Sequence, residues 1–456
     1  MNKWTRRSML KWLWVGVIMA SLQTIQAALH LAGADALARG ADAGFRALLP
    51  LARRDGPTPF PTPSEPPAGT ATSNPTAYGD PTFTPEALPS ATPSATGGAT
   101  TTPTVAPTPT LTATGVPGRQ PRVVHVHDAR ATHWQDARGW YGDHVDQDAV
   151  DAMLVRGLTD LTRTNCAGAA WGLLLPAYRP GQKIAVKINM NNSFLNDPGN
   201  MIDALIQPIN ALIRSLLSAG VQEDDVWVYD AIRPMPARFC QGRQFRSVRF
   251  FGDPGCAGAV APFAHVHPSL RATFSHPALV RQRWLTDLLY QASYVINMPI
   301  IKKHGTHPVT LGFKNHFGSM RTPVGDGRDN PHVYINPTHE DYRSTYSPLV
   351  DIYANPNIAP KTVLTIGDAL YGAPGWNAVP VPWRQFGNQV PNSLLFSRDP
   401  VAIDCVMCDM LRAEWGVIDA AYDYLRLAQE RGLGTFERGE PFGSGYRQLD
   451  YVRVEN

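Results

Sequence analysis

Short apolar runs rich in β-branched and aromatic residues recur along the last three quarters of the chain and predict strands. The predicted strands cover residues 183–188, 226–229, 294–298, 362–366 and 394–396. Between the first two, apolar side chains recur every three or four positions over residues 201–219, which predicts an amphipathic helix. Strands that alternate with helices are typical of a layered α/β domain with a mostly parallel sheet and flanking helices.

Three further signals concern the helix limits. Residues 284–292 predict a second helix, and Pro208 inside the first helix predicts a kink or a later start. Asp399 and Pro400 predict a helix start, because the Asp side chain accepts the free N–H groups of the first turn and Pro has no N–H to leave unpaired.

The first quarter of the chain has a different pattern. Residues 57–118 are dominated by Pro and Thr and contain no Lys or Arg, so they cannot form a core and are predicted to be a disordered, semi-rigid linker. Residues 29–56 are rich in Ala and Leu and receive no assignment. The globular α/β domain is therefore expected over residues 119–456.

Residues 1–28 resemble a twin-arginine-type signal peptide. Arg6 and Arg7 precede an apolar run over residues 12–22, and small residues follow from Ala27. The pattern predicts export to the cell envelope or the medium, with an ordinary secretion signal and an uncleaved N-terminal anchor as alternatives. No second apolar run of spanning length occurs, so membrane contact is expected only through this segment.

The charge and the cysteine content limit which partners and cofactors are expected. The formal net charge is only +3, and no basic run is interleaved with aromatic residues, so a nucleic-acid ligand is not expected. The five cysteines are too scattered for an iron–sulfur cluster. Cys240 and Cys256 can pair across a short loop outside the cytoplasm, whereas Cys405 and Cys408 fall one helical turn apart and are expected to be buried thiols.

The densest set of polar residues follows the predicted strand at residues 294–298. Its members are Lys302, Lys303, His304, His307, Lys314, Asn315 and His316. Ligands of α/β sheets bind beyond the carboxyl ends of the strands. Ammonium and imidazole groups suit a carboxylate or a phosphate, and imidazole can also move protons near neutral pH. The alternative is a solvated basic loop in which these side chains do not face one another.

Polar residues also follow the other predicted strands. They are Lys187, Asn189 and Asn191 after the first strand, Asp230 after the second, Asp368 after the fourth and Asp399 after the fifth. If the strands are parallel, their ends share one edge of the sheet. Asp399 is also the expected helix cap, and Asp230 can instead pair with Arg233. Asp368 precedes a predicted glycine loop at residues 372–375, which favours a functional role for its carboxylate.

Histidine spacing leaves a divalent metal as an open alternative. The relevant pairs are His125 and His127, His265 and His267, and His304 and His307. Strand spacing would place both rings of each of the first two pairs on one face, although such histidines are more often half-buried strand residues. Pro308 disfavours the helix that the third pair would need.

Several of these motifs together resemble the domain of unknown function 362 family. The family's strand end Asn-x-Pro matches residues 297–299, its Lys-x-His matches Lys302 and His304, and its Lys-Asn-x-x-Gly matches residues 314–318. Further similar segments lie at residues 187–189, 366–375 and 397–404, so the resemblance covers roughly residues 183–411. Many members carry a ferredoxin-like, Cys-rich cluster segment, and this chain has no such run of cysteines.

The sequence therefore predicts an exported protein of this type, an enzyme that acts on a small carboxylate or phosphate. The alternative is a stalk-tethered anion-binding or metal-binding protein without catalysis. The expected catalytic residues are Lys302, His304, Lys314 and Asp368. The expected ligand-binding residues are Lys187, Asn189, Asn191, Lys303, His307, Asn315, His316 and Asp230. P-loop, dinucleotide-binding and hydrolase-elbow motifs are absent from the sequence, which disfavours those three classes.

Overall fold

The computed structural model describes residues 120–133, 139–193, 200–256, 262–263, 265–321 and 327–456. The expectations for residues 1–28, 29–56 and 57–118 lie outside the described residues. Within the described ranges, no helix is both long and apolar enough to cross a membrane.

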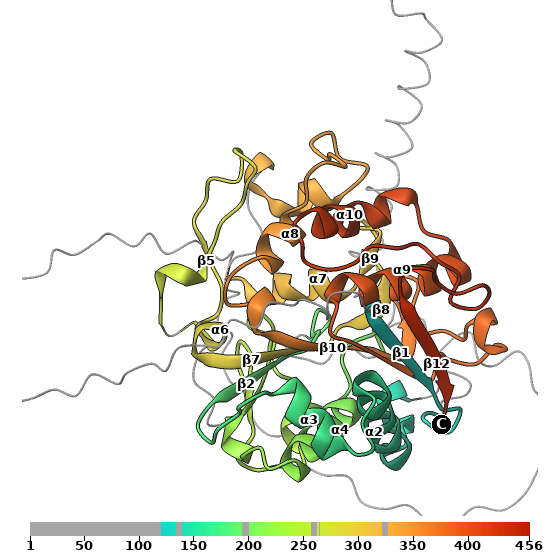
Figure 1. Ribbon diagram of the computed structural model, residues 1–456. Helices are drawn as coiled ribbons and strands as arrows, with labels where there is room; N and C mark the ends of the chain where they lie inside the picture. Colours follow the sequence, from blue (N-terminus) through green and yellow to red (C-terminus); the bar gives the residue numbers. More distant parts are fainter. Residues whose placement is uncertain (1–119, 134–138, 194–199, 257–261, 264, 322–326) are drawn as a thin grey trace, which may run out of the picture. The chain divides into compact units, whose positions relative to one another are not determined.

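A ten-stranded mixed sheet forms the centre of the domain, in the order β12-β1-β11-β10-β7-β2-β3-β4, and β8 and β9 extend it beside β10 (Figure 1). Its strands are β1 (Arg122–His127), β2 (Lys183–Lys187), β3 (Val226–Tyr229), β4 (Arg249–Phe251), β7 (Ala292–Asn297), β8 (Ile300–Lys303), β9 (Val309–Thr310), β10 (Thr362–Ala373), β11 (Ser393–Ser397) and β12 (Asp450–Glu455). A separate hairpin joins β5 (Arg271–Ala272) and β6 (Arg283–Trp284). Most neighbouring pairs in the large sheet are parallel, as predicted.

Helices cover both faces of this sheet (Figure 1). The first face carries α2 (Gln147–Thr162), α3 (Ala167–Leu174) and α4 (Ile206–Ser218). The second carries α7 (Gly312–Asn315), α8 (Pro348–Tyr353), α9 (Pro400–Trp415) and α10 (Asp423–Glu430). Alternate residues of one strand enter the two cores, so Ile184 and Val186 of β2 pack on the first face and Ala185 packs on the second. The domain is therefore a layered α/β fold.

β11 runs antiparallel to both of its neighbours, β10 and β1. The residue that follows β11 therefore lies at the opposite edge of the sheet from those that follow the parallel strands β2, β3 and β7. The expectation that Asp399 shares an edge with Asp230 is wrong for this reason. The expected helix cap is confirmed, because the Asp399 carboxylate accepts the N–H groups of Val401 at 3.0 Å and Ala402 at 2.8 Å.

Three element limits differ from the sequence expectation by more than two residues. α4 begins at Ile206 rather than at residue 201, in line with the later start that Pro208 predicts. The second helix is reduced to α6 (Asp287–Gln291), since residues 283–284 pair in the β5–β6 hairpin instead. The strand predicted at residues 362–366 continues to Ala373, so Gly372 lies within β10 and not in a loop. A Cβ on Gly372 would lie 2.3 Å from the Trp383 ring, which explains the glycine there.

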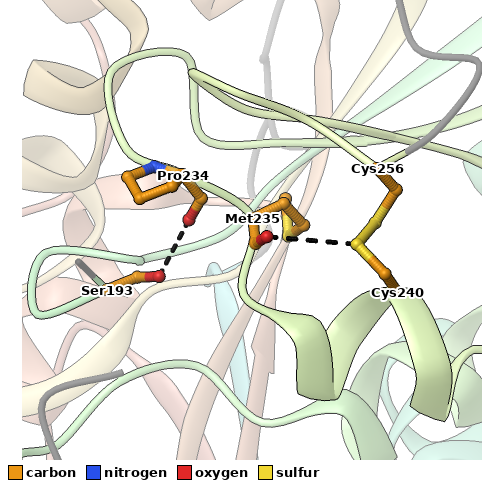
Figure 2. Close-up of a disulfide and its surroundings, with 5 residues drawn as sticks. All are labelled: Ser193, Pro234, Met235, Cys240 and Cys256. Carbon is orange, nitrogen blue, oxygen red and sulfur yellow. Dashed lines mark hydrogen bonds between the residues drawn. A yellow bond between two sulfur atoms is a disulfide. The ribbon is translucent and has the colours of Figure 1, made fainter. Parts of the chain in front are cut away.

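A disulfide joins Cys240 of α5 (Ala237–Gly242) to Cys256, with Cα atoms 5.5 Å apart (Figure 2). Close to it, the Ser193 hydroxyl donates a hydrogen bond to the Pro234 carbonyl at 2.8 Å, which ties the segment after β2 to the segment after β3 (Figure 2). Cys405 and Cys408 are free and buried in α9, which confirms their prediction as buried thiols.

Candidate functional site

The short helix α7 is held at both ends by side chains from other elements. Asp404 of α9 accepts the N–H groups of Gly312 at 2.8 Å and Phe313 at 3.1 Å. Asn297, at the end of β7, donates to the Gly312 carbonyl at 3.0 Å, and its side-chain oxygen accepts from the Asn315 amide at 2.8 Å. A Cβ on Gly312 would lie 2.7 Å from Asp404 Oδ1, so only glycine fits at this position. The turn that carries the Lys-Asn motif is therefore rigidly positioned.

Five basic residues from four segments lie near one another, and we call them the basic cluster. They are Lys302 of β8, His304 and His307 of the β8–β9 turn, Lys314 of α7 and His332 of the 3-10 helix Pro331–Ile335. The pKa of His304 is lowered to about 2, first by burial and then by the charges of the other four residues. Burial followed by the charge of Lys314 lowers the pKa values of His307 and His332 to about 3. The three imidazoles are therefore neutral at pH 7.

Hydrogen bonds fix where each neutral imidazole carries its proton. His304 Nδ1 accepts the backbone N–H of His307 at 3.2 Å, so the proton of His304 lies on Nε2. His307 Nδ1 lies against the Val309 carbonyl and must donate, which leaves its Nε2 as an acceptor. His332 Nδ1 lies 3.2 Å from Asn330 Oδ1 and must donate, so its Nε2 is also an acceptor. The basic cluster thus contains one imidazole that can donate through Nε2 and two that can accept.

The Lys314 side chain is buried, and among the described residues it has no charged or hydrogen-bonding partner. It is 9 % exposed, and its Nζ lies 4.5 Å from the centroid of the Phe317 ring. Burial, followed by repulsion from Lys302, lowers the pKa of Lys314 to about 7. No acceptor in the described ranges hydrogen-bonds to this amine, and no carboxylate contributes to its pKa. This is an uncompensated basic group in a poorly solvated place.

Lys302 faces the first core and is balanced by Asp203. Its Nζ donates to the carbonyls of Trp376 at 3.1 Å and Ile202 at 3.4 Å. The amide of Asn192 donates to the same two carbonyls, each at 2.7 Å. Burial lowers the pKa of Lys302 and raises that of Asp203, and the attraction between their charges offsets part of each shift.

Sequence reasoning missed Asp203. The predicted helix over residues 201–219 included this residue in its first turn, whereas residues before Ile206 are not helical and Asp203 is buried. Its Oδ1 accepts the Asn192 N–H at 3.0 Å, and Arg238 lies 3.5 Å from its Oδ2. An acidic residue just ahead of a delayed helix start was the signal available for it.

A second polar group lies at the ends of β2 and β3. Lys187 is fully buried, with its Nζ 3.1 Å from Asp230 Oδ2 and 3.2 Å from Asn315 Oδ1. Asn189 also donates to Asn315 Oδ1, at 3.4 Å. Burial lowers the pKa of Lys187, and the charge of Asp230 offsets part of this change. A Cβ on Gly318 would lie 2.8 Å from Lys187 Nζ, so the motif glycine leaves room for this ion pair.

Three more of the predicted site residues are not part of the basic cluster. Lys303 alternates away from Lys302 along β8 and donates to the Gly416 carbonyl at 2.9 Å. His316 is buried, with its ring against Tyr353 and its Nδ1 3.2 Å from the Ser319 hydroxyl. The half-buried Asn191 donates its N–H to Asn189 Oδ1 at 3.4 Å.

Asp368 is also outside the basic cluster, and its side chain is buried. Its Oδ1 accepts the Leu370 N–H at 3.1 Å, and burial raises its pKa to about 7. Its charge raises the pKa values of Tyr141 and Tyr371, which places it beside these rings. In the part of the chain that the structure describes, no hydrogen bond or ion pair joins Asp368 to Lys302 or Lys314.

The candidate metal histidines have protein partners. His125 lies 2.8 Å from both the Tyr451 and the Ser393 hydroxyl, and His127 pairs with Glu455 at 2.5 Å. The expectation of strand spacing at residues 265 and 267 is wrong, because these residues precede a 3-10 helix. Among the described residues, no three His, Cys, Asp or Glu side chains are grouped as metal ligands would be.

These features define a layered α/β protein with a buried basic cluster beyond its parallel strands. The family model named Domain of unknown function (DUF362) matches residues 184–409, and the chain belongs to this family. No curated protein and no solved structure matches the chain. The family description names no activity, so function has to be argued from the site.

Proposed function

We propose that the domain is an enzyme that binds a small carboxylate or phosphate at the basic cluster and acts on it. The observation that carries the proposal is the buried Lys314 amine, which has no acceptor in the described part of the chain and lies close to Lys302 and His304. A buried ammonium without a partner is destabilising, and an anion beside it would supply the missing charge. The neutral His304 can add a hydrogen bond from Nε2.

Proton transfer is the catalytic role that best fits Lys314. Its pKa of about 7 leaves comparable amounts of the two protonation states near neutral pH, as an efficient acid or base requires. Bound anion would raise this pKa, because an opposite charge favours the ammonium. Lactate serves here as a simple test carboxylate, because it stays ionised near neutral pH. Its binding should strengthen as the pH falls through the pKa of Lys314.

The test is calorimetric titration of the full chain with lactate and with inorganic phosphate at pH 7. Lys314→Ala should abolish binding of both anions. Lys303→Ala is the matched control, because the neighbouring lysine bonds to the Gly416 carbonyl away from Lys314, and it should leave binding unchanged. Equal affinities for the wild type and Lys314→Ala would refute the proposal.

A second candidate function is anion capture without catalysis. It is favoured by the isolated position of Asp368, the carboxylate expected to act opposite the basic cluster. If Asp368→Asn leaves lactate binding and the pH dependence of turnover unchanged, Asp368 has no catalytic part. If no turnover accompanies binding with any tested hydroxy acid, oxo acid or phosphate ester, the capture function is preferred.

We also propose export by the twin-arginine route. The sequence pattern around Arg6 and Arg7 motivates it. The Cys240–Cys256 disulfide adds support, because disulfides persist mainly in oxidising compartments outside the cytoplasm.

A further inference from the structure

We infer that Lys314 is a nucleophilic amine that forms an imine with the carbonyl group of a small anionic oxo compound. The inference rests on the proposed anion site. It adds the class of ligand and gives the unprotonated Lys314 amine a nucleophilic role in place of proton transfer. It is drawn from a comparison of the lysine side chains that the structure describes.

Five of the six described lysines have their amines engaged by oxygen acceptors. The partners are Asp225 for Lys183, Asp230 for Lys187, the Ile202 and Trp376 carbonyls for Lys302, the Gly416 carbonyl for Lys303, and the Leu289 and Tyr290 carbonyls for Lys361. Lys314 is the exception within these ranges, since its amine meets only the face of Phe317. A nucleophilic amine needs a free lone pair, and an acceptor bound to its N–H groups would favour the protonated form instead.

The surroundings of Lys314 favour the unprotonated amine. Burial penalises the ammonium, and the positive charge of Lys302 acts in the same direction. The Phe317 ring face acts in the opposite direction, because it attracts a cation. Burial and the Lys302 charge together lower the pKa of Lys314 to about 7. Desolvation and a neighbouring cation are two known ways to activate a lysine as a nucleophile.

The ligand class follows from two requirements of the basic cluster, imine formation at Lys314 and binding of an anionic group. Imine formation needs an aldehyde or ketone, and the cation of Lys302 with the donor Nε2 of His304 needs an anionic group on the same molecule. A 2-oxo acid supplies both groups on adjacent carbons. A phosphate-bearing aldehyde has the same chemistry on a longer chain, and the experiment separates the two.

The covalent step balances without an oxidant or a reductant. The Lys314 nitrogen lone pair forms a C–N bond to the carbonyl carbon, and the C=O π pair moves to oxygen. A proton passes from nitrogen to that oxygen to give the carbinolamine. Loss of the hydroxyl with a further proton releases one water and leaves the C=N bond, and water addition reverses the sequence. The acceptor Nε2 of His307 and the donor Nε2 of His304 are groups in the basic cluster that can take and return these protons.

The experiment traps the imine by reduction. The full chain is incubated at pH 7 with pyruvate and cyanoborohydride, digested and analysed by peptide mass spectrometry. The expected result is one reduced adduct, on the peptide that contains Lys314, formed about tenfold faster than on any other lysine. Lys314→Arg keeps the charge and should lose the adduct, whereas Lys303→Arg should keep it. Glycolaldehyde phosphate replaces pyruvate in a parallel reaction, and acetone, which has no anionic group, should label Lys314 more slowly.

The outcomes separate this inference from the proposed function. Absence of lactate binding would refute the anion site itself. Lactate and pyruvate binding with no adduct on Lys314, or with adducts spread over several lysines, would overturn the imine while leaving the anion site intact. An adduct with glycolaldehyde phosphate and none with pyruvate would overturn the oxo acid and assign a phosphate-bearing aldehyde.

Discussion

The Asp404 carboxylate accepts the backbone N–H of Gly312 at 2.8 Å across 92 residues of sequence. This contact connects α9 to the turn that presents Lys314. The Asp404 oxygens also accept from Phe313 and the Tyr424 hydroxyl, so both oxygens are used. Asp404 ends the family-like segment at residues 397–404, and α7 carries the Lys-Asn motif at residues 314–318. These two segments are therefore in contact through α7.

Asp404→Asn should weaken the contact between α9 and α7. Asparagine offers one accepting oxygen, and its NH2 group would face a backbone N–H that needs an acceptor. The free energy of unfolding, measured by urea denaturation, should fall by about 1–3 kcal/mol. Lactate binding should weaken as well, because the turn that carries Lys314 loses an anchor. The control is Asp419→Asn, an exposed partner of Arg438, which should change stability by less than about 1 kcal/mol.

Lys314→Met should stabilise the protein at pH 7 while removing anion binding. The change replaces a buried basic group with an apolar side chain of similar length, and a gain of about 1–4 kcal/mol is expected. The folded pKa of Lys314 is about 7 against an ordinary value of 10.5, so between these values the unfolded chain binds more protons than the folded one. Raising the pH across this window should therefore stabilise the wild type relative to the variant. A stability difference that stays constant from pH 7 to 10 would contradict the burial argument.

Gly318→Ala should disrupt the buried pair of Lys187 and Asp230. The new Cβ would lie 2.8 Å from Lys187 Nζ and 2.9 Å from Asp230 Oδ2, so one partner of this buried pair must move. A loss of about 3–5 kcal/mol in the free energy of unfolding is expected. Gly168→Ala, in α3 with open space around its Cβ position, is the matched control and should be neutral or stabilising by up to about 1 kcal/mol. Similar effects of the two changes would argue against a tightly packed site.

Replacing Arg6 and Arg7 together with lysine should leave precursor in the cytoplasm. Cell fractionation and immunoblotting would measure the distribution. Export in full amount by the double variant would instead indicate the ordinary secretion signal. Changing Lys3 to Arg, outside the arginine pair, serves as the control and should have no effect.

The sequence carried enough information for the α/β class and the main strands, because burial on both faces leaves continuous apolar runs such as residues 294–298. It could not give the direction of β11, which depends on pairing with β1 and β10 far away in sequence. For the site, the motif located Lys302, His304 and Lys314 together. The separation of Lys303 follows from strand alternation, but which lysine of the pair faces the first core depends on the register of β8 with β10 and β9.

The surroundings of Asp203 and Asp368 could not be predicted from the sequence. One acquires its partner through an irregular segment ahead of α4, and the other lies in a strand that continues for five residues beyond it. Apart from the delayed helix start after Asp203, the burial of these two residues has no local signature, since it depends on how distant segments pack. The charge balance of a buried site is a tertiary property.

The Ile202 and Trp376 carbonyls are each held by two donors, Lys302 and Asn192, and the amide makes the shorter bonds. Lys302 is therefore not needed to hold these two carbonyls together. If an incoming anion draws the Lys302 amine toward itself, the amide still keeps the two backbone segments together. Under the proposed anion binding, the Lys302 amine could therefore turn toward the ligand while Asn192 keeps the two carbonyls in place.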